Sequence, residues 1–178
     1  MKLYRVKVPV IARAVLESLC NDGSILVEPE NRAEAENDLI AIMEEFLRRD
    51  HDLGEAVKSR MANQAIPYDQ RGKVRGAIAT EWNHPTGKEI PRYLARQIIE
   101  NFMISRFVED VFADDRDMYT KVVRIVEAHD VNEDALRLEA MERIKNVAEG
   151  SVEYEDALAR AMREVKTRYG LISTRASR

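Results

Sequence analysis

Cysteine is almost absent from this sequence: Cys20 is the single one, so no disulfide can form within the chain. Long apolar runs are absent as well, because no stretch approaches the roughly 20 residues that a membrane-spanning helix needs. The opening MKLYRVKVPV alternates charged and apolar residues and lacks the hydrophobic core of a secretory signal. No Asn-x-Ser/Thr glycosylation site occurs. Together these absences predict a cytoplasmic protein that does not bind membranes.

Glycine and proline are scarce too, with seven and five residues in a chain of 178. Most of them stand between runs whose apolar residues recur every three or four positions, which favours an all-α fold. Hydrophobic residues make up 45% of the chain and charged residues 34%, which provides a core and argues against disorder.

The apolar periodicity predicts about eight helices. They are expected over residues 10–22, 31–50, 52–63, 69–82, 91–102 with an extension towards 111, 115–126, 132–149 and 151–169. A break is expected near Asp52, because Asp52 and Glu55 have the spacing of a capping box and a continued apolar stripe would bury Asp50. Short extended segments are expected near residues 3–6 and 24–28, pairing with each other.

The helix IARAVLESL, residues 11–19, is written again as LARQIIENF, residues 94–102, at an offset of 83. The same offset aligns Leu39, Ile40 and Met43 with Val122, Val123 and Val126. Amphipathic helices share such patterns by chance, but the order of the helices also repeats, so we predict a tandem duplication.

The predicted first repeat spans residues 1–88 and the second spans residues 89–170, followed by a frayed tail over 171–178. Four short helices of one repeat can bury only part of their apolar surface. We therefore expect the two four-helix halves to pack around a shared core as one compact body. The joint between them, residues 83–91, is too short for a flexible tether.

Six segments carry a family resemblance: MKLYRVKVPVIA, EEFLRRDHDL, IPYDQ, EWNHPTG, ARQIIENFMISRFVEDVFADD and RIKNVAEG. In this order and spacing the chain resembles the bacterial "domain of unknown function 507" proteins over nearly its full length. The resemblance implies a helical, cytosolic bacterial protein. It implies no activity, cofactor or site residue.

The net charge of −4 is unevenly distributed. Residues 28–55 contain ten acidic residues and three arginines, whereas residues 157–178 contain six basic residues and the single acid Glu164. This asymmetry predicts an acidic face and a basic end, for which solvated helix surfaces are the simplest interpretation.

Seven basic residues are candidates for partner binding. Three of them begin a predicted helix, where the helix dipole disfavours cations unless a phosphate or an acidic protein surface compensates. The candidates are Arg71, Lys73, Arg75, Arg160, Arg163, Lys166 and Arg168.

No pattern predicts a catalytic residue, a metal site or a cofactor. The histidines at 51, 84 and 129 lack the spacing that places two imidazoles on one helix face. The acids of residues 109–117 fit helix capping better than a calcium loop. Thr86-Gly87-Lys88 lacks the glycine spacing of a phosphate loop. Cys20 and Trp82 are expected to fill the core.

The sequence therefore favours a non-enzymatic helical interaction or adaptor protein. Its partner would be another protein or a second copy, contacted through the acidic 28–55 face or the basic 157–178 helix. The alternative is a nucleic-acid-binding regulator that uses the basic residues at 71–75 and 160–168. The partner, the pathway and the oligomeric state are left open.

Overall fold

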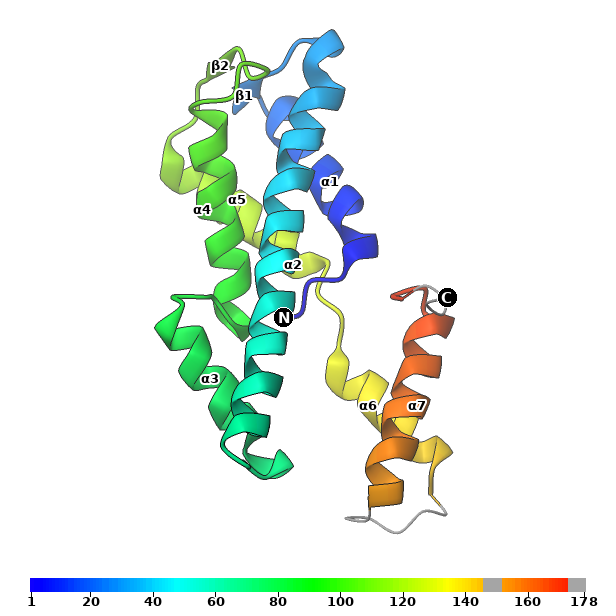
Figure 1. The fold of residues 1–178 in the computed structure, drawn as a ribbon. Helices are drawn as coiled ribbons and strands as arrows, with labels where there is room; N and C mark the ends of the chain where they lie inside the picture. Colours follow the sequence, from blue (N-terminus) through cyan, green and yellow to red (C-terminus); the bar gives the residue numbers. More distant parts are fainter. Residues whose placement is uncertain (146–151, 173–178) are drawn as a thin grey trace.

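The computed structural model describes residues 1–145 and 152–172, and most of them are helical, as the sequence predicts. The main elements are α1 (Val8–Asn21), β1 (Ile25–Leu26), α2 (Arg32–Asn63), α3 (Arg71–Glu81), α4 (Ile90–Phe102), β2 (Asp110–Val111), α5 (Asp115–Ala128), α6 (Glu133–Arg143) and α7 (Val152–Arg168). Short 3₁₀ turns occur at Arg5–Lys7, Pro29–Asn31, Tyr68–Gln70 and Gly87–Glu89. Figure 1 shows α2 as the long axis of the molecule.

The expected break near Asp52 is wrong, and the described part of the chain has fewer than eight α-helices because α2 continues to Asn63. Its inward stripe continues at alternating spacings of four and three through the buried Leu39, Met43 and Phe46, then Asp50, then the buried Leu53 and Val57. Asp50 does fall on this stripe, but Arg75 of α3 forms an ion pair with it. This ion pair compensates the charge of Asp50, so a carboxylate at this position does not end the helix.

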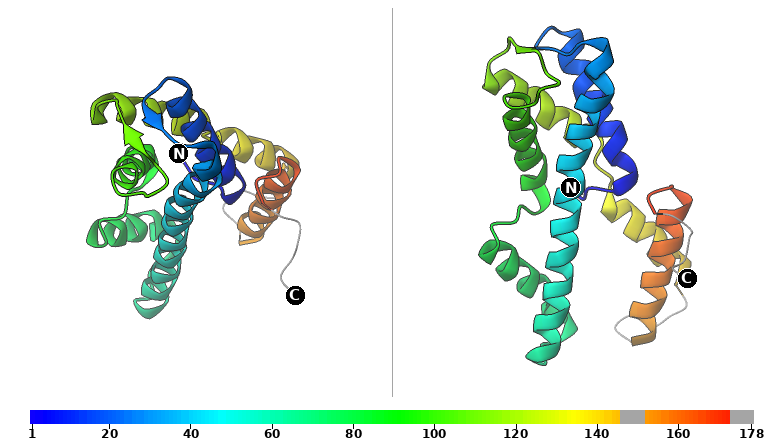
Figure 2. Two further views of the ribbon diagram at one scale, coloured as in Figure 1. Left: turned by 90° about the horizontal axis from the view of Figure 1, so that it is seen from above. Right: turned by 45° about the horizontal axis from the view of Figure 1, so that its top comes forward.

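The main hydrophobic core lies between α1, the first half of α2, α4 and α5. In this core α1 contacts α2 and α5, while α4 contacts α5 and α2 (Figure 2). The second half of α2 and α3 share a separate cluster, and α6 and α7 share a third. The expectation of a core common to four helices of each half is therefore wrong. The second half of α2 packs on α3, and α6 and α7 pack on each other and on Tyr4, so only α1, α2, α4 and α5 enter the core common to both halves.

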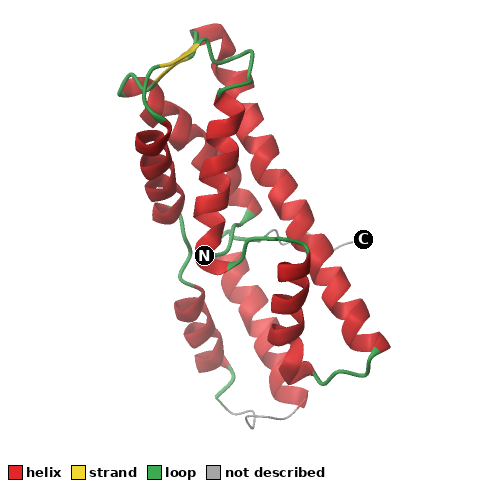
Figure 3. Cartoon of the chain, turned by 90° about the vertical axis from the view of Figure 1, so that its left-hand side faces the viewer, coloured by secondary structure: helices red, strands yellow, loops and turns green. Residues whose placement is uncertain are grey.

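Two short strands join the halves at one end of the molecule. In the antiparallel pair β1–β2, Ile25 lies opposite Val111 and Leu26 opposite Asp110 (Figure 3). The expected pairing of residues 24–28 with residues 3–6 is wrong, because residues 5–7 form a 3₁₀ turn that leads into α1. The α1–α2 and α4–α5 connections meet at the same end of the core, which brings their extended residues together.

Residues 83 positions apart have matching environments in the two halves. Both α1 and α4 carry a proline in their first turn. The buried pairs include Ile11 with Leu94, Val15 with Ile98, Leu19 with Phe102, Leu39 with Val122, Met43 with Val126 and Leu53 with Leu136. The ion pair between Arg60 and Glu81 has its counterpart between Arg143 and Glu164, both members 83 residues further along.

The N-terminal segment links the α6–α7 hairpin to the rest of the molecule. Tyr4 is buried in the α6–α7 cluster, and the Lys166 ammonium lies 5.6 Å from its ring centroid. The Met1 amino group lies 3.6 Å from the Asp130 carboxylate. Leu171, expected to begin the frayed tail, is buried in the same cluster. Residues 173–178 of that tail, and 146–151 at the predicted junction of the last two helices, lie outside the described residues.

Candidate functional site

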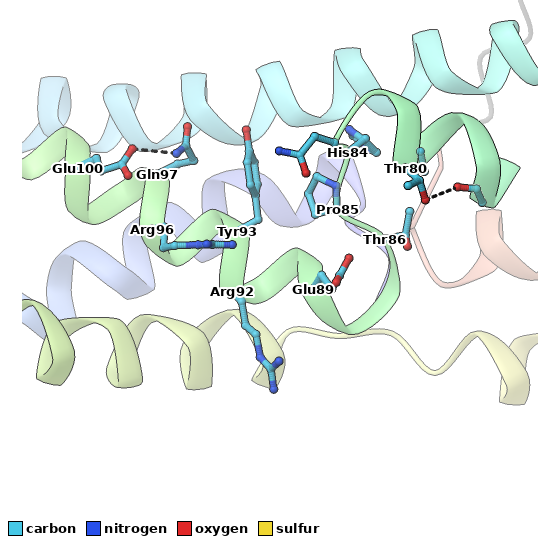
Figure 4. Close-up of a pocket in the computed structure, with 13 residues that line it drawn as sticks. Thr80, His84, Pro85, Thr86, Glu89, Arg92, Tyr93, Arg96, Gln97 and Glu100 are labelled. Atoms are coloured by element: carbon cyan, nitrogen blue, oxygen red, sulfur yellow. Dashed lines mark hydrogen bonds between the residues drawn. The ribbon is translucent and has the colours of Figure 1, made fainter.

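A polar groove of about 720 Å³ runs between α3 and α4 (Figure 4). Its walls come from the exposed sides of both helices, and the loop that joins them closes one end. The lining residues are Gly76, Ala79, Thr80, Asn83, His84, Pro85, Thr86, Glu89, Arg92, Tyr93, Arg96, Gln97 and Glu100. The tight turn into this loop is made at Asn83, whose φ of 49° lies in the left-handed region.

His84 lies buried beside this groove and joins α2 to the loop. Its Nε2 lies 3.2 Å from Oδ1 of Asp50, and its ring stacks on Phe46 with centroids 5.1 Å apart. Its Nδ1 is buried and has no hydrogen-bond partner among the described residues. Burial lowers the pKa of His84, although the Asp50 carboxylate opposes that shift. A neutral imidazole packed in this way supports the α2–α3–α4 junction.

The predicted basic residues of α3 fall beside a second hollow of about 480 Å³, which Arg71 and Arg75 line together with Lys2. Arg71 lies over the Tyr68 ring, and its Nη1 donates to the Tyr68 hydroxyl at 3.3 Å. The guanidinium of Arg75 forms an ion pair with Asp50. Lys73 is exposed. The basic residues at the start of α3 suggested an external anion that offsets the helix dipole. Arg75 needs no such anion, because the Asp50 carboxylate already faces it.

The basic residues of α7 lie on a different helix from those of α3. Lys166 pairs with Glu133 at 3.0 Å and Arg168 pairs with Glu139, so both charges are compensated within the hairpin. Arg160 and Arg163 are exposed and form no ion pair with a described residue. Lys2 is influenced by basic residues of both helices. Burial lowers its pKa most, the charge of Lys166 on α7 lowers it further, and the charge of Arg75 on α3 adds to the effect.

The acidic 28–55 face is also largely neutralised within the chain. Six of its ten carboxylates form an ion pair: Glu36 with Arg13, Glu44 with Arg5, Glu45 and Asp52 with Arg48, Asp50 with Arg75 and Glu55 with Lys58. The acids of this face that form no ion pair with a described residue are Glu28, Glu30, Glu34 and Asp38, and Asp38 accepts a hydrogen bond from Ser105. Glu28 and Glu30 follow β1 in the chain.

A surface at the β1–β2 end was not predicted from the sequence. Ile104 and Phe112, in and after the α4–β2 connection, are 83% and 65% exposed, and Leu26 and Met103 are exposed as well. Acidic residues are interspersed with these apolar residues along the same two segments of the chain. A hydrogen bond with Glu28, and then the nearby negative charges, raise the pKa of Glu109. We call Leu26, Glu28, Glu30, Met103, Ile104, Glu109, Asp110 and Phe112 the ladder surface. It combines two segments, residues 26–30 and 103–112, that are roughly 80 residues apart in the sequence. Only the pairing of β1 with β2 brings these segments together.

The remaining candidates have structural roles. Asp114 caps α5 by accepting from the N–H groups of Arg116 and Asp117 at 2.9 and 3.0 Å. Burial raises the pKa of the half-buried Cys20 thiol, which disfavours the reactive thiolate and is consistent with a packing role. Trp82 is 41% exposed at the end of α3, so its expected place in the core is wrong. In the described ranges no three His, Cys, Asp or Glu residues are placed to hold a metal ion.

None of the described helices combines the length and the apolar character that a membrane span requires. No curated protein matches the chain. A profile of the family described as "Protein of unknown function (DUF507)" matches residues 1–171, which is nearly the whole sequence. The resemblance first seen in the sequence segments is thereby confirmed, and the chain belongs to the DUF507 family.

Proposed function

We propose that this protein is a non-enzymatic protein-binding module whose ladder surface docks a protein partner. The observation that carries the proposal is the exposure of Ile104 and Phe112, at 83% and 65%, at one end of an otherwise well-buried core. Large apolar side chains gathered on a surface and rimmed by charge are typical of interaction sites.

The charges around these side chains indicate what the partner carries. The pKa of Glu109 is raised, first by a hydrogen bond with Glu28 and then by repulsion from the negative charges of Glu28, Asp110 and Glu30. A Lys or Arg side chain from a partner would relieve that repulsion. The ladder surface therefore fits a partner that presents apolar anchors within a basic rim.

The sequence also favours a tandem duplication, with repeats at residues 1–88 and 89–170 forming one compact body. The matched buried pairs and the matched ion pairs Arg60–Glu81 and Arg143–Glu164 support it. The order of 3₁₀ turn, helix, short strand and helix in residues 5–63 recurs in residues 87–128, except for an additional 3₁₀ turn at Pro29–Asn31 in the first, and this supports it too. In this interpretation the ladder surface lies where the equivalent connections of the two repeats meet.

The nucleic-acid-binding alternative has less support. Arg75, Lys166 and Arg168 have carboxylate partners within the chain, which leaves Arg71, Lys73, Arg160 and Arg163 for phosphates. A gel shift with RNA or DNA at about 50 mM salt, lost in Arg71→Gln/Lys73→Gln, would favour this alternative.

Comparative affinity capture tests the proposed function. The full chain, the double variant Ile104→Ser/Phe112→Ser and the control Val10→Ser/Leu138→Ser would each be used as bait in a lysate of the native host. The control removes two exposed apolar side chains elsewhere on the molecule. We expect a protein that the wild type and the control retain and the ladder variant loses. Identical capture by all three folded baits would contradict the proposal.

A further inference from the structure

The first half of the molecule contains a two-point ion pair between its first two helices. Arg13 of α1 donates from Nε to Oε2 of Glu36 on α2 at 3.3 Å and from Nη2 to Oε1 at 3.1 Å. The hydrogen bond with Glu36 raises the pKa of Arg13. A guanidinium and a carboxylate match in this way because both are planar and each offers two atoms.

The same positions in the second half carry a different pair. Residues 83 further along are Arg96 on α4 and Tyr119 on α5, so a tyrosine stands where Glu36 stands. Arg96 and the half-buried Tyr119 line one hollow of about 560 Å³. An arginine therefore stands at both positions, but a carboxylate faces it only in the first half.

Two more arginines line this hollow, Arg92 and Arg116. All three arginines are exposed, and none forms an ion pair with a described residue. Seven described arginines elsewhere form an ion pair: Arg5, Arg13, Arg48, Arg60, Arg75, Arg143 and Arg168. What distinguishes this hollow is that three arginines without an ion pair to a described residue line it together. We call Arg92, Arg96, Arg116 and Tyr119 the arginine hollow.

Two acids also border the arginine hollow, but neither neutralises it through an ion pair. Glu100 accepts a hydrogen bond from Gln97 Nε2 at 2.9 Å. Asp115 lies in the first turn of α5, where a carboxylate is stabilised by the helix dipole. Three arginines thus face two acids, and one of these acids, Asp115, is already stabilised by the dipole of α5.

The arginine hollow continues into the groove between α3 and α4, because Arg92, Arg96 and Glu100 line both. Figure 4 shows Arg92 extending from α4 towards α5 while Arg96 lies along α4 beside Tyr93. The guanidinium groups thus stand along a continuous track rather than around a closed pocket. Such a track suits an extended chain better than a free ion.

We propose that the arginine hollow binds a carboxylate side chain from an acidic segment of a protein partner, in the place that Glu36 fills in the first half. Tyr119 provides a flat base beneath that carboxylate, and the rest of the segment lies along the α3–α4 groove. This site is separate from the ladder surface and opposite to it in charge. It does not rest on the docking proposed there.

A peptide titration tests the inference with the full chain. The probe is fluorescein-labelled octaglutamate, followed by fluorescence anisotropy at about 50 mM salt, where surface charges are weakly screened. We expect binding that Arg96→Gln weakens by about tenfold, as the loss of one charge-assisted pair does. Arg13→Gln is the matched control, since it removes the equivalent arginine that already has an internal partner, and it should change the affinity by less than about twofold.

The variant Tyr119→Glu places a carboxylate of the chain itself beside Arg96, as Glu36 lies beside Arg13. It should abolish peptide binding and should melt at a higher temperature than Tyr119→Gln, with the difference shrinking at ~0.5 M salt. Because this comparison measures stability, it does not depend on the peptide.

The inference is overturned if octaglutamate does not bind, if Arg13→Gln and Arg96→Gln weaken binding equally, or if Tyr119→Glu binds like the wild type. Tighter competition by an oligodeoxythymidine of equal charge, or by millimolar inorganic phosphate, would also overturn it, because the site would then take phosphate. Ile104→Ser/Phe112→Ser should leave peptide binding unchanged, so the ladder surface and the arginine hollow can fail independently.

Discussion

His84 Nε2 lies 3.2 Å from Oδ1 of Asp50, and the same carboxylate oxygen faces the guanidinium of Arg75. One half-buried acid of α2 is thus shared by the loop before α4 and by α3. This contact and the stacking of His84 on Phe46 hold α3 and the loop before α4 against α2. The junction also makes stability depend on pH.

The folded-state pKa of His84 is lowered, first by burial and then by the charges of Arg49 and Arg75, and Asp50 opposes the shift. Since the unfolded imidazole titrates near pH 6.5, it binds protons more readily than the folded one below that pH. The stabilising contribution is therefore present above about pH 6.5 and is lost as the pH falls towards the folded-state pKa.

We expect the free energy of unfolding to fall less between pH 7 and pH 5.5 in His84→Gln than in the wild type. Urea unfolding at the two pH values measures this. The exposed His51 supplies a control, because His51→Gln should keep the wild-type slope. Equal slopes in the wild type and His84→Gln would show that the buried imidazole does not control the pH response.

Gly54 tests whether α2 is continuous. It lies inside the helix, and a methyl group at this position would meet nothing within 4 Å. Gly54→Ala should therefore stabilise the protein by about 0.5–1 kcal/mol, as alanine does in a helix interior. Gly87→Ala is the opposite case, because Gly87 has a φ of +54° and an alanine there should cost about 1–2 kcal/mol. Thermal unfolding of both variants measures these effects, and destabilisation by Gly54→Ala would indicate a break near Asp52.

Asp114 tests the role of the acidic cluster at residues 109–117. Its carboxylate accepts two backbone N–H groups of α5, so Asp114→Ala should lower the free energy of unfolding by about 1 kcal/mol. Asp115→Ala removes a neighbouring acid without removing the cap and should have a smaller effect. If the cluster bound calcium instead, millimolar calcium would raise the melting temperature of the wild type and not that of Asp114→Ala.

Tyr4 tests how the α6–α7 hairpin is held. Its ring lies in the hairpin cluster, while the adjacent Leu3 lies in the main core. Tyr4→Ala should speed hydrogen exchange in α6 and α7 and leave α1 and α4 protected, since the main core is a separate cluster. Tyr4→Phe should be tolerated, because the Tyr4 hydroxyl is buried without a partner among the described residues. Uniformly faster exchange in Tyr4→Ala would contradict the separation of the two clusters.

Much of the fold could be predicted because apolar spacing reports burial directly. Leu39, Met43 and Phe46 recur at helical spacing within the helix predicted over residues 31–50, and all three are buried. The helix predicted to begin at residue 132 does begin there, because the Asn132 side chain accepts from the Ala135 N–H at 3.0 Å and α6 starts at Glu133. Local chemistry of this kind depends on neighbours within one or two turns, which a single sequence contains.

The errors arose where a distant residue decides the outcome. Asp50 suggested a break in α2 because its partner, Arg75, lies 25 residues away on another helix. The strand at residues 25–26 had no local signal for its partner at 110–111, so it was paired with the wrong segment. The ladder surface and the arginine hollow were missed for the same reason, since each combines residues from both halves or from two helices.

Hydrogen exchange on the complex tests the central claim, that the ladder surface docks a protein partner, most directly. The partner retained in the comparative capture would be purified and mixed with the full chain. We predict slower exchange in residues 24–28 and 103–112 and no change at Arg71–Arg75 or Arg160–Arg168. Unchanged exchange at the ladder surface, or protection of those two basic segments instead, would contradict the account.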